Sequence, residues 1–522
     1  MEESSMHWLN SANGFSKYMK STYLIILSSL FLLSCTNFLD EESTGTMSID
    51  SNLSSVESCT ALANSTYVNT NVFDANEGTW GGNTIWLLEF MTGKVNSEAS
   101  QTEFLDFRNL TLNSRSRYIE KWWADCYAGI AKANLAIKKI PEFSGVDKNI
   151  RSRLLGEAYF MRALYYFYLV RIFGDLPKIT EVQSELAELY IPRSPIKEIY
   201  DEIIIPDLLN AEQSSLPIKD ETGRVSMGAV KSLLADVYLT YAGFPVQGGK
   251  KYYAESAKKS LEVISSGVYS LYPEYSDLRQ PSNNNKKEFI FQVQFSMDKS
   301  HNDMIPKVLP PKSDISAYSS EYGSLVPTKE FYESFRENDK RAQEREFFFS
   351  SYPGNPKKLP ADSPNLEKVD FGGFYIYKFF DENAIVNTAK SDLNWTLYRY
   401  ADVLLMYAEA QVEADGHANS TALEALNLVR RRAKLPDFMN SNKEVFKEAV
   451  WDERYFELCF EGKIWFDMVR TRKIRNDFNG KYENFTEYTT VYGKRYTNQF
   501  LLFPLPQREM NANTALVQNE GY

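Results

Sequence analysis

Five carboxylates lie close together near the end of the chain: Asp452, Glu453, Glu457, Glu461 and Asp467. Glu453, Glu457 and Glu461 are spaced four residues apart, so a helix would place them on one face. Two carboxylates about 5–9 Å apart can hydrolyse a glycosidic bond, one as acid and the other as base or nucleophile. Alternatively, the set forms ion pairs that hold helices together, which we favour because neighbouring elements crowd a scaffold helix. The candidate partners are Arg399, Arg430, Arg431, Arg432, Arg454 and Arg470.

Other catalytic patterns are missing from the sequence. It contains no Gly-x-Ser-x-Gly elbow, no histidine beside a serine or cysteine in a recognised signature, and no phosphate-binding glycine loop. The 3 histidines and 4 cysteines are too widely spaced for a zinc site. The sequence therefore predicts a protein that is not an enzyme and has no cofactor or metal centre. A structural calcium ion among the loop carboxylates is an alternative that we leave open.

Aromatic residues in polar loops point to binding instead. A sugar has flat C–H faces bordered by hydroxyls, so its site needs aromatic rings beside amide or carboxylate groups. Ordinary loop packing is the alternative for each of these residues. The predicted ligand-binding residues share a setting in loops without helical periodicity: Asn76, Trp80, Asn83, Tyr318, Glu321, Tyr322 and Tyr375.

The start of the chain predicts export and lipidation. Residues 23–35 are apolar but shorter than the roughly 20 residues of a membrane-spanning helix, and they follow Lys17 and Lys20 as in a secretory signal. The sequence Leu-Leu-Ser-Cys at 32–35 resembles the bacterial lipobox, which predicts cleavage before Cys35 and its acylation, for example with palmitate. Residues 1–34 would then be the signal peptide, with 1–18 a mis-called start, and residues 35–60 the lipidated N-terminus and tether.

Charge argues against one class of partner. The chain has 58 basic and 69 acidic residues, a net charge of −11, and a pI of about 5.2. Such a surface repels phosphate backbones, so we expect no nucleic-acid partner.

The elements that must position these residues are mostly helices. Apolar residues recur at three- and four-residue steps in two regions, about 118–270 and 394–475. Pairs of amphipathic helices with small residues at their crossings predict a mainly α fold with a tetratricopeptide-like scaffold. Residues 72–117 and 270–392 are rich in loops, with a strand at Glu288–Phe295, and we expect them to form an irregular binding subdomain. The expected helices are Tyr118–Ile140, Arg151–Phe173, Ser194–Leu209, Met227–Ala242, Tyr252–Ser265, Tyr398–Ala414, Thr421–Ala433 and Glu444–Arg470.

Several stretches resemble the SusD/RagB family of outer-membrane nutrient-binding lipoproteins. Together they extend over nearly the whole mature chain, so residues 61–522 are expected to form a single SusD-like unit. The matching stretches are Cys35–Asp40, Gly156–Pro177, Gly223–Ala235, Tyr398–Ala410, Asp452–Arg470, Leu502–Pro506 and Gln518–Tyr522.

This resemblance implies a surface lipoprotein of the outer membrane that faces the extracellular side. It implies that the protein binds oligosaccharide or polysaccharide and passes it to a TonB-dependent, SusC-like transporter. The alternatives are a tetratricopeptide-type receptor or adaptor for peptides or other nutrients and, less favoured, a surface glycosidase.

Overall fold

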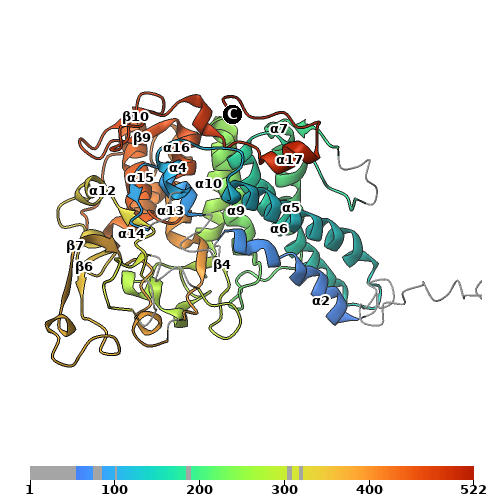
Figure 1. The fold of residues 1–522 in the computed structure, drawn as a ribbon. Helices are drawn as coiled ribbons and strands as arrows, with labels where there is room; N and C mark the ends of the chain where they lie inside the picture. Colours follow the sequence, from blue (N-terminus) through green and yellow to red (C-terminus); the bar gives the residue numbers. More distant parts are fainter. Residues whose placement is uncertain are drawn as a thin grey trace, which may run out of the picture. The chain divides into compact units, whose positions relative to one another are not determined.

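The computed structural model describes residues 55–73, 85–99, 103–183, 190–302, 308–316, 321–388 and 390–522, all within one unit. Helices predominate in this part of the chain, which confirms the predicted mainly α fold (Figure 1). The α-helices are α2 (Val56–Ser65), α3 (Trp86–Met91), α4 (Glu103–Arg108), α5 (Arg117–Lys139), α6 (Lys148–Phe173), α7 (Ile196–Ile199), α8 (Ile205–Glu212), α9 (Met227–Ala242), α10 (Lys250–Ser265), α12 (Lys329–Glu333), α13 (Tyr400–Asp415), α14 (Ser420–Arg432), α15 (Lys443–Glu457), α16 (Ile464–Thr471) and α17 (Gln507–Ala512).

Strands in the described residues are short and form antiparallel pairs. The pairs are β1 (Val95–Asn96) with β5 (Val326–Pro327), β2 (Leu176–Pro177) with β3 (Arg193–Ser194), β4 (Phe289–Val293) with β8 (Trp395–Arg399), β6 (Phe348–Tyr352) with β7 (Val369–Ile376), and β9 (Lys473–Arg475) with β10 (Tyr482–Asn484). The strand predicted at Glu288–Phe295 is confirmed as β4. The pair β1–β5 joins the two loop-rich segments, although they are far apart in sequence.

The two helical regions of the sequence form one stacked scaffold. Helix α5 packs on α6, α6 on α8, and α9 on α10. Helix α10 then packs against α13, which also contacts α14 and α15. Each helix buries its apolar face against a neighbour, as the predicted stacking of helix pairs requires.

Helix α6 shows why the scaffold helices begin and end where they do. The Asp147 side chain accepts hydrogen bonds from the N–H groups of Asn149 and Ile150, which otherwise have no partner in the first turn. Gly174 stops the helix with φ of 77°, a conformation that favours glycine. A second glycine, Gly129 in α5, allows close packing on α6, since a Cβ there would lie 2.4 Å from the Tyr165 ring.

Three helix predictions need correction. The helix predicted from Ser194 begins at Ile196, because Ser194 pairs with β2 as part of strand β3. The stretch Glu444–Arg470 is not continuous, because α15 ends at Glu457 and α16 begins at Ile464. Between the two helices, Phe460 and Gly462 take φ of 66° and 72°, values that a right-handed helix does not contain. The helix predicted at Tyr398–Ala414 begins at Tyr400, because residues 395–399 pair with β4 as strand β8.

The apolar core of the described residues has a main part centred on the scaffold, a second part in the loop-rich subdomain and a third between α2, α5 and α6. In the main core, Phe335 packs on Phe456 with ring centroids 4.5 Å apart, so this core extends from α15 into the subdomain. The second core holds the hairpin β6–β7 against the neighbouring loops. Its buried members are Leu309, Ile315, Phe349, Tyr352, Tyr375, Tyr377, Phe380, Ala384 and Ile385.

Candidate functional site

Three of the predicted ligand-binding residues fall in the described part of the chain. They are Glu321, Tyr322 and Tyr375. Cys35, Asn76, Trp80, Asn83 and Tyr318 lie outside the described residues, so their predicted roles stay predictions.

Glu321 shapes the loop in which it lies. Its side chain is buried, and its carboxylate accepts hydrogen bonds from the backbone N–H groups of Asp314 at 3.0 Å and Ser316 at 2.9 Å. The Lys358 ammonium lies 3.6 Å away. These contacts fix residues 314–316 relative to 321, a positioning role that the sequence did not predict for this glutamate. Direct contact between Glu321 and a ligand stays a prediction.

Tyr375 ties the second core to the segment after β1. Its ring is buried against Phe371, and its hydroxyl donates to the Glu98 carboxylate, 2.9 and 3.0 Å from the two oxygens. Burial and this carboxylate raise the pKa of Tyr375 above its ordinary value, so the phenol stays protonated. Tyr375 thus holds the subdomain together, with little of its ring available for stacking.

Tyr322 lies where several segments meet. It is half-buried, and the backbone of the next residue, Gly323, forms hydrogen bonds with two other segments. The Glu98 N–H donates to the Gly323 carbonyl at 2.7 Å, and the Gly323 N–H donates to the Leu309 carbonyl at 2.7 Å. The structure therefore brings Glu321, Tyr322 and Tyr375 into one neighbourhood, with Glu98 as a member that no sequence pattern identified.

A polar cleft of about 680 Å³ lies in the same subdomain. Residues 276–282 and 377–392 supply most of its walls. Tyr377 and Phe380 line the cleft and stack with centroids 4.3 Å apart, but both are buried. The polar side chains that line the cleft and are exposed belong to Gln280, Ser282, Glu382, Asn383 and Asn387.

This cleft has the chemistry to bind a polyhydroxylated ligand. Amides both donate and accept hydrogen bonds, and a carboxylate accepts them, so together they can pair with hydroxyls. The cleft volume falls in the range of about 300–1,000 Å³ that is typical of small-molecule sites. Sequence reasoning missed these residues, although Glu382 and Asn383 follow an aromatic cluster in a non-periodic segment, the same signal that identified Trp80.

The carboxylates of α15 and the turn after it are occupied by ion pairs. Glu457 is fully buried, with Arg399 at 2.7 Å, Arg432 at 2.8 Å and Arg341 at 3.2 Å. Burial alone would raise its pKa, but these arginines lower the pKa of Glu457 well below its ordinary value. Such a carboxylate cannot serve as a general acid, which supports the interpretation that these residues hold elements together.

The same holds for the neighbouring carboxylates. Glu453 lies 2.7 Å from Arg341, and Glu461 lies 2.5 Å from Lys378 and 2.8 Å from Arg399. Arg341 and Lys378 come from the loop-rich subdomain and were not among the predicted partners. Ion pairs therefore connect the subdomain to the scaffold.

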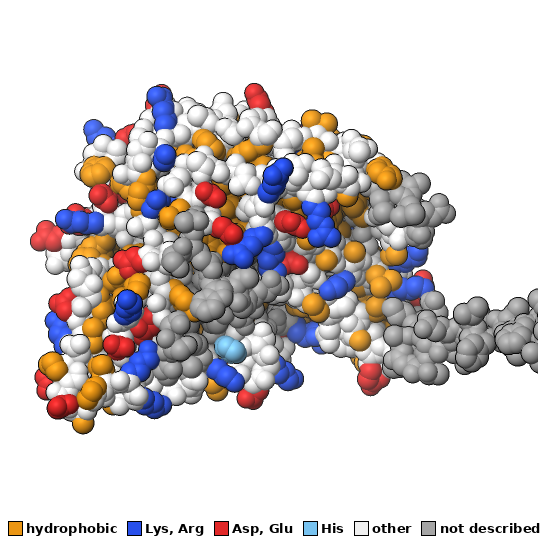
Figure 2. Space-filling model, viewed as in Figure 1, with side chains coloured by type: hydrophobic (Ala, Val, Ile, Leu, Met, Phe, Trp, Pro, Cys, Tyr) orange, Lys and Arg blue, Asp and Glu red, His pale blue; other side chains and the backbone are white. Residues whose placement is uncertain are grey.

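Charged side chains are mixed on one face of the molecule. On the face shown in Figure 2, basic and acidic side chains are interspersed over the described residues. Within the described ranges, no cluster of three or more histidine, cysteine, aspartate or glutamate side chains is arranged to hold a metal ion. No helix in those ranges combines the length and the apolar character that crossing a bilayer requires.

Two family models match this chain. Residues 287–522 match the model of the SusD family, and residues 37–239 match a model described as starch-binding associating with outer membrane. The two matches include most of the helical scaffold and the wall of the polar cleft formed by residues 377–392, while the wall at 276–282 lies between them.

Individual proteins are similar to this chain over most of its length. A SusD superfamily protein of Parabacteroides distasonis is 60% identical in its solved structure, with a TM-score of 0.88 over 89% of this chain and 99% of that one. SusD-like protein P2 of Formosa agariphila is 26% identical over 97% of this chain and all of its own length. Starch-binding protein SusD of Bacteroides thetaiotaomicron is 23% identical over 71% of this chain and 73% of its own.

Proposed function

Because this chain belongs to the SusD family, we propose that it is a surface glycan-binding protein that captures oligosaccharide or polysaccharide and passes it to a transporter. The observation that carries the proposal is the polar cleft, whose exposed amides and carboxylate can pair with sugar hydroxyls. A starch-binding protein among the relatives supports the ligand class.

The binding site that we propose has two parts. One is the polar cleft, and the other consists of Tyr322 with the predicted residues Trp80 and Tyr318, which lie outside the described residues. Ring faces from these aromatics would stack on the sugar, while Asn383 and Asn387 of the cleft would bind its hydroxyls. The protein would act by binding alone, because the carboxylates that resemble a hydrolytic pair are engaged with arginines.

Membership of the family supports a proposal about delivery and localisation. We propose that a TonB-dependent, SusC-like transporter of the outer membrane receives the glycan. The acyl chains on Cys35 would anchor the protein to that membrane with its binding face toward the outside, since several buried chains give durable attachment.

The proposal is tested with the purified protein in affinity gels that contain individual polysaccharides. We expect retardation by at least one glycan, and loss of it in the double variants Trp80→Ala/Tyr318→Ala or Asn383→Ala/Asn387→Ala. Asn149→Ala is the matched control, since this exposed amide lies at the start of α6. Retardation that survives both double variants would refute the site. Binding of extended peptides in place of every glycan would favour the receptor alternative, and release of reducing ends would favour a glycosidase.

A further inference from the structure

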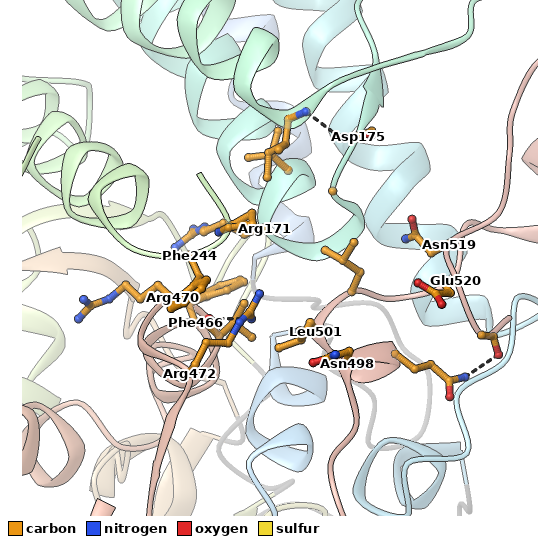
Figure 3. A pocket seen from close by; sticks show the side chains of 18 of the residues that line it. Arg171, Asp175, Phe244, Phe466, Arg470, Arg472, Asn498, Leu501, Asn519 and Glu520 are labelled. Atoms are coloured by element: carbon orange, nitrogen blue, oxygen red, sulfur yellow. Dashed lines mark hydrogen bonds between the residues drawn. The ribbon is translucent and has the colours of Figure 1, made fainter. Parts of the chain in front are cut away.

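A second cavity, of about 710 Å³, lies in the scaffold, and it shares no lining residue with the polar cleft. Its walls come from the end of α6, the turn after α9, helix α16 and residues 497–521. Figure 3 shows Phe244, Phe466 and Arg472 on one side, and Asn519 and Glu520 of the C-terminal segment on the other. Nothing in the proposed function uses this cavity.

Arginines give the cavity a positive character in a protein of net charge −11. Three of its four arginines have a polar side chain as partner. Arg470 pairs with Glu409 at 2.6 Å, Arg171 lies 3.8 Å from the Asp236 carboxylate, and Arg193 donates to the Asn519 side chain at 2.7 Å and to backbone carbonyls.

Arg472 is the exception. It caps α16 in the left-handed conformation, with φ of 56°, and one of its guanidinium nitrogens donates to the Val469 carbonyl at 2.9 Å. Among the residues that the structure describes, no carboxylate lies within 4.0 Å of this guanidinium. Burial lowers the pKa of Arg472 to about 10, and no neighbouring negative charge offsets that effect, so the group is cationic at neutral pH but poorly solvated.

The surroundings of Arg472 indicate what would pair with it. Its guanidinium lies 5.0 Å from the centre of the Phe244 ring, which is 36% exposed and leaves an apolar surface open to the cavity. Asn498 adds an exposed amide. Of the two carboxylates in the lining, Asp175 accepts a hydrogen bond from the Ile196 N–H, and Glu520 is exposed on the opposite wall.

We propose that this cavity is a second binding site that takes a uronic acid, with the sugar carboxylate on Arg472 and a C–H face of the ring on Phe244. A guanidinium matches a carboxylate because its fork of donors can form two parallel charge-assisted hydrogen bonds. The binding of a carboxylate here stands on the cavity itself, whereas its attachment to a sugar rests on the proposed function.

The test is calorimetric titration of the purified full-length protein with galacturonate, galactose and acetate. We expect galacturonate to bind at least tenfold more tightly than galactose, since only the acid can pair with Arg472. We also expect it to bind more tightly than acetate, which has no ring face for Phe244. Arg472→Gln should weaken galacturonate binding at least tenfold, Arg472→Lys less, and Phe244→Ala severalfold.

Arg151→Gln is the matched control, because its guanidinium also donates to a backbone carbonyl but lies at the opposite end of α6. Galacturonate binding that persists in Arg472→Gln, or that is absent from the unaltered protein, overturns the proposal. Equal affinity for galactose overturns the role of the carboxylate, and equal affinity for acetate overturns the assignment to a sugar. Retention of neutral polysaccharide should be unchanged in Arg472→Gln, which separates this site from the polar cleft.

Discussion

At the scale of single residues, the partners of a buried carboxylate decide how it affects the stability of the protein and how that stability depends on pH. Glu89 and Glu457 are both buried, but their partners differ. Glu457 faces arginines, whereas the Glu89 carboxylate accepts a hydrogen bond from the Gly462 N–H at 2.7 Å and has no cation this close among the described residues. The pKa values of the two groups therefore move in opposite directions.

Glu89 should make the protein less stable as the pH rises. Burial raises the pKa of Glu89 from 4.5 to about 7, so the folded protein holds this proton more tightly than the unfolded chain does. Between pH 4.5 and 7 the unfolded state loses the proton first, and the free energy of unfolding falls by about 3 kcal/mol across that window. Glu89→Gln should remove this dependence, which urea denaturation at pH 5 and pH 8 can measure. Parallel pH profiles for the variant and the unaltered protein would contradict the assignment.

Glu457 should be essential for stability. Glu457→Gln leaves Arg341, Arg399 and Arg432 buried without the carboxylate that they share, and breaking a buried pair in this way costs about 3–5 kcal/mol. Denaturant unfolding of the variant measures the loss. Glu424→Gln is the control, because its pairing with Arg431 is half exposed and should contribute less than about 1 kcal/mol. Similar losses in the two variants would contradict a special role for Glu457.

At the scale of elements, periodicity predicted helices well and their interruptions poorly. The sequence predicts both ends of helix α9, Met227–Ala242, and the helix begins directly after Ser226, whose side chain accepts a hydrogen bond from the Ala229 N–H. The break after Glu457 was missed because the sequence on both sides keeps helical spacing, and only Gly462 marks the turn. Strand β8 was missed because its structure depends on pairing with β4, about a hundred residues away.

The sequence predicted which region of the chain holds the candidate site, but not which of its residues are exposed. Aromatic residues in polar loops indicated the subdomain, but contacts between distant segments decide which rings are exposed. Tyr375 looked suitable for stacking, yet its hydroxyl bonds to Glu98, which lies 277 positions away, and its ring is buried. No local pattern contains that information. The polar cleft is likewise assembled from two segments that lie roughly a hundred residues apart.

The close crossing of α5 and α6 leads us to expect that Gly129→Ala destabilises the protein. Gly129→Ala would place a methyl group 2.4 Å from the Tyr165 ring, and that ring is fixed because its hydroxyl donates to the Thr66 carbonyl at 2.7 Å. Overpacking of this kind costs about 1–3 kcal/mol, which thermal and urea unfolding would detect. Gly373→Ala serves as control, since the nearest atom would be 3.9 Å away. A stability gain in Gly129→Ala, as expected from helix propensity alone, would contradict the close packing.

At the scale of the whole described unit, the loop-rich subdomain and the scaffold share their interior. Phe335 of the subdomain packs on Phe456 of α15, and Phe331 lies 5.6 Å from Phe460. Arg341, fully buried, connects Asp339 of the subdomain with Glu453 of α15. The contacts between the two parts are therefore both apolar and ionic, and the main core contains residues of both.

This shared interior predicts that subdomain and scaffold unfold together. Arg341→Gln should cost about 3–5 kcal/mol, because it leaves Asp339 and Glu453 buried without this cation. If the two parts form one cooperative unit, hydrogen exchange should accelerate equally in the hairpin β6–β7 and in helices α10 and α13, which contain none of the carboxylates paired with Arg341. If the subdomain opened independently, the hairpin alone would exchange faster. Hydrogen exchange with peptide resolution distinguishes the two, and the buried pairs favour the first.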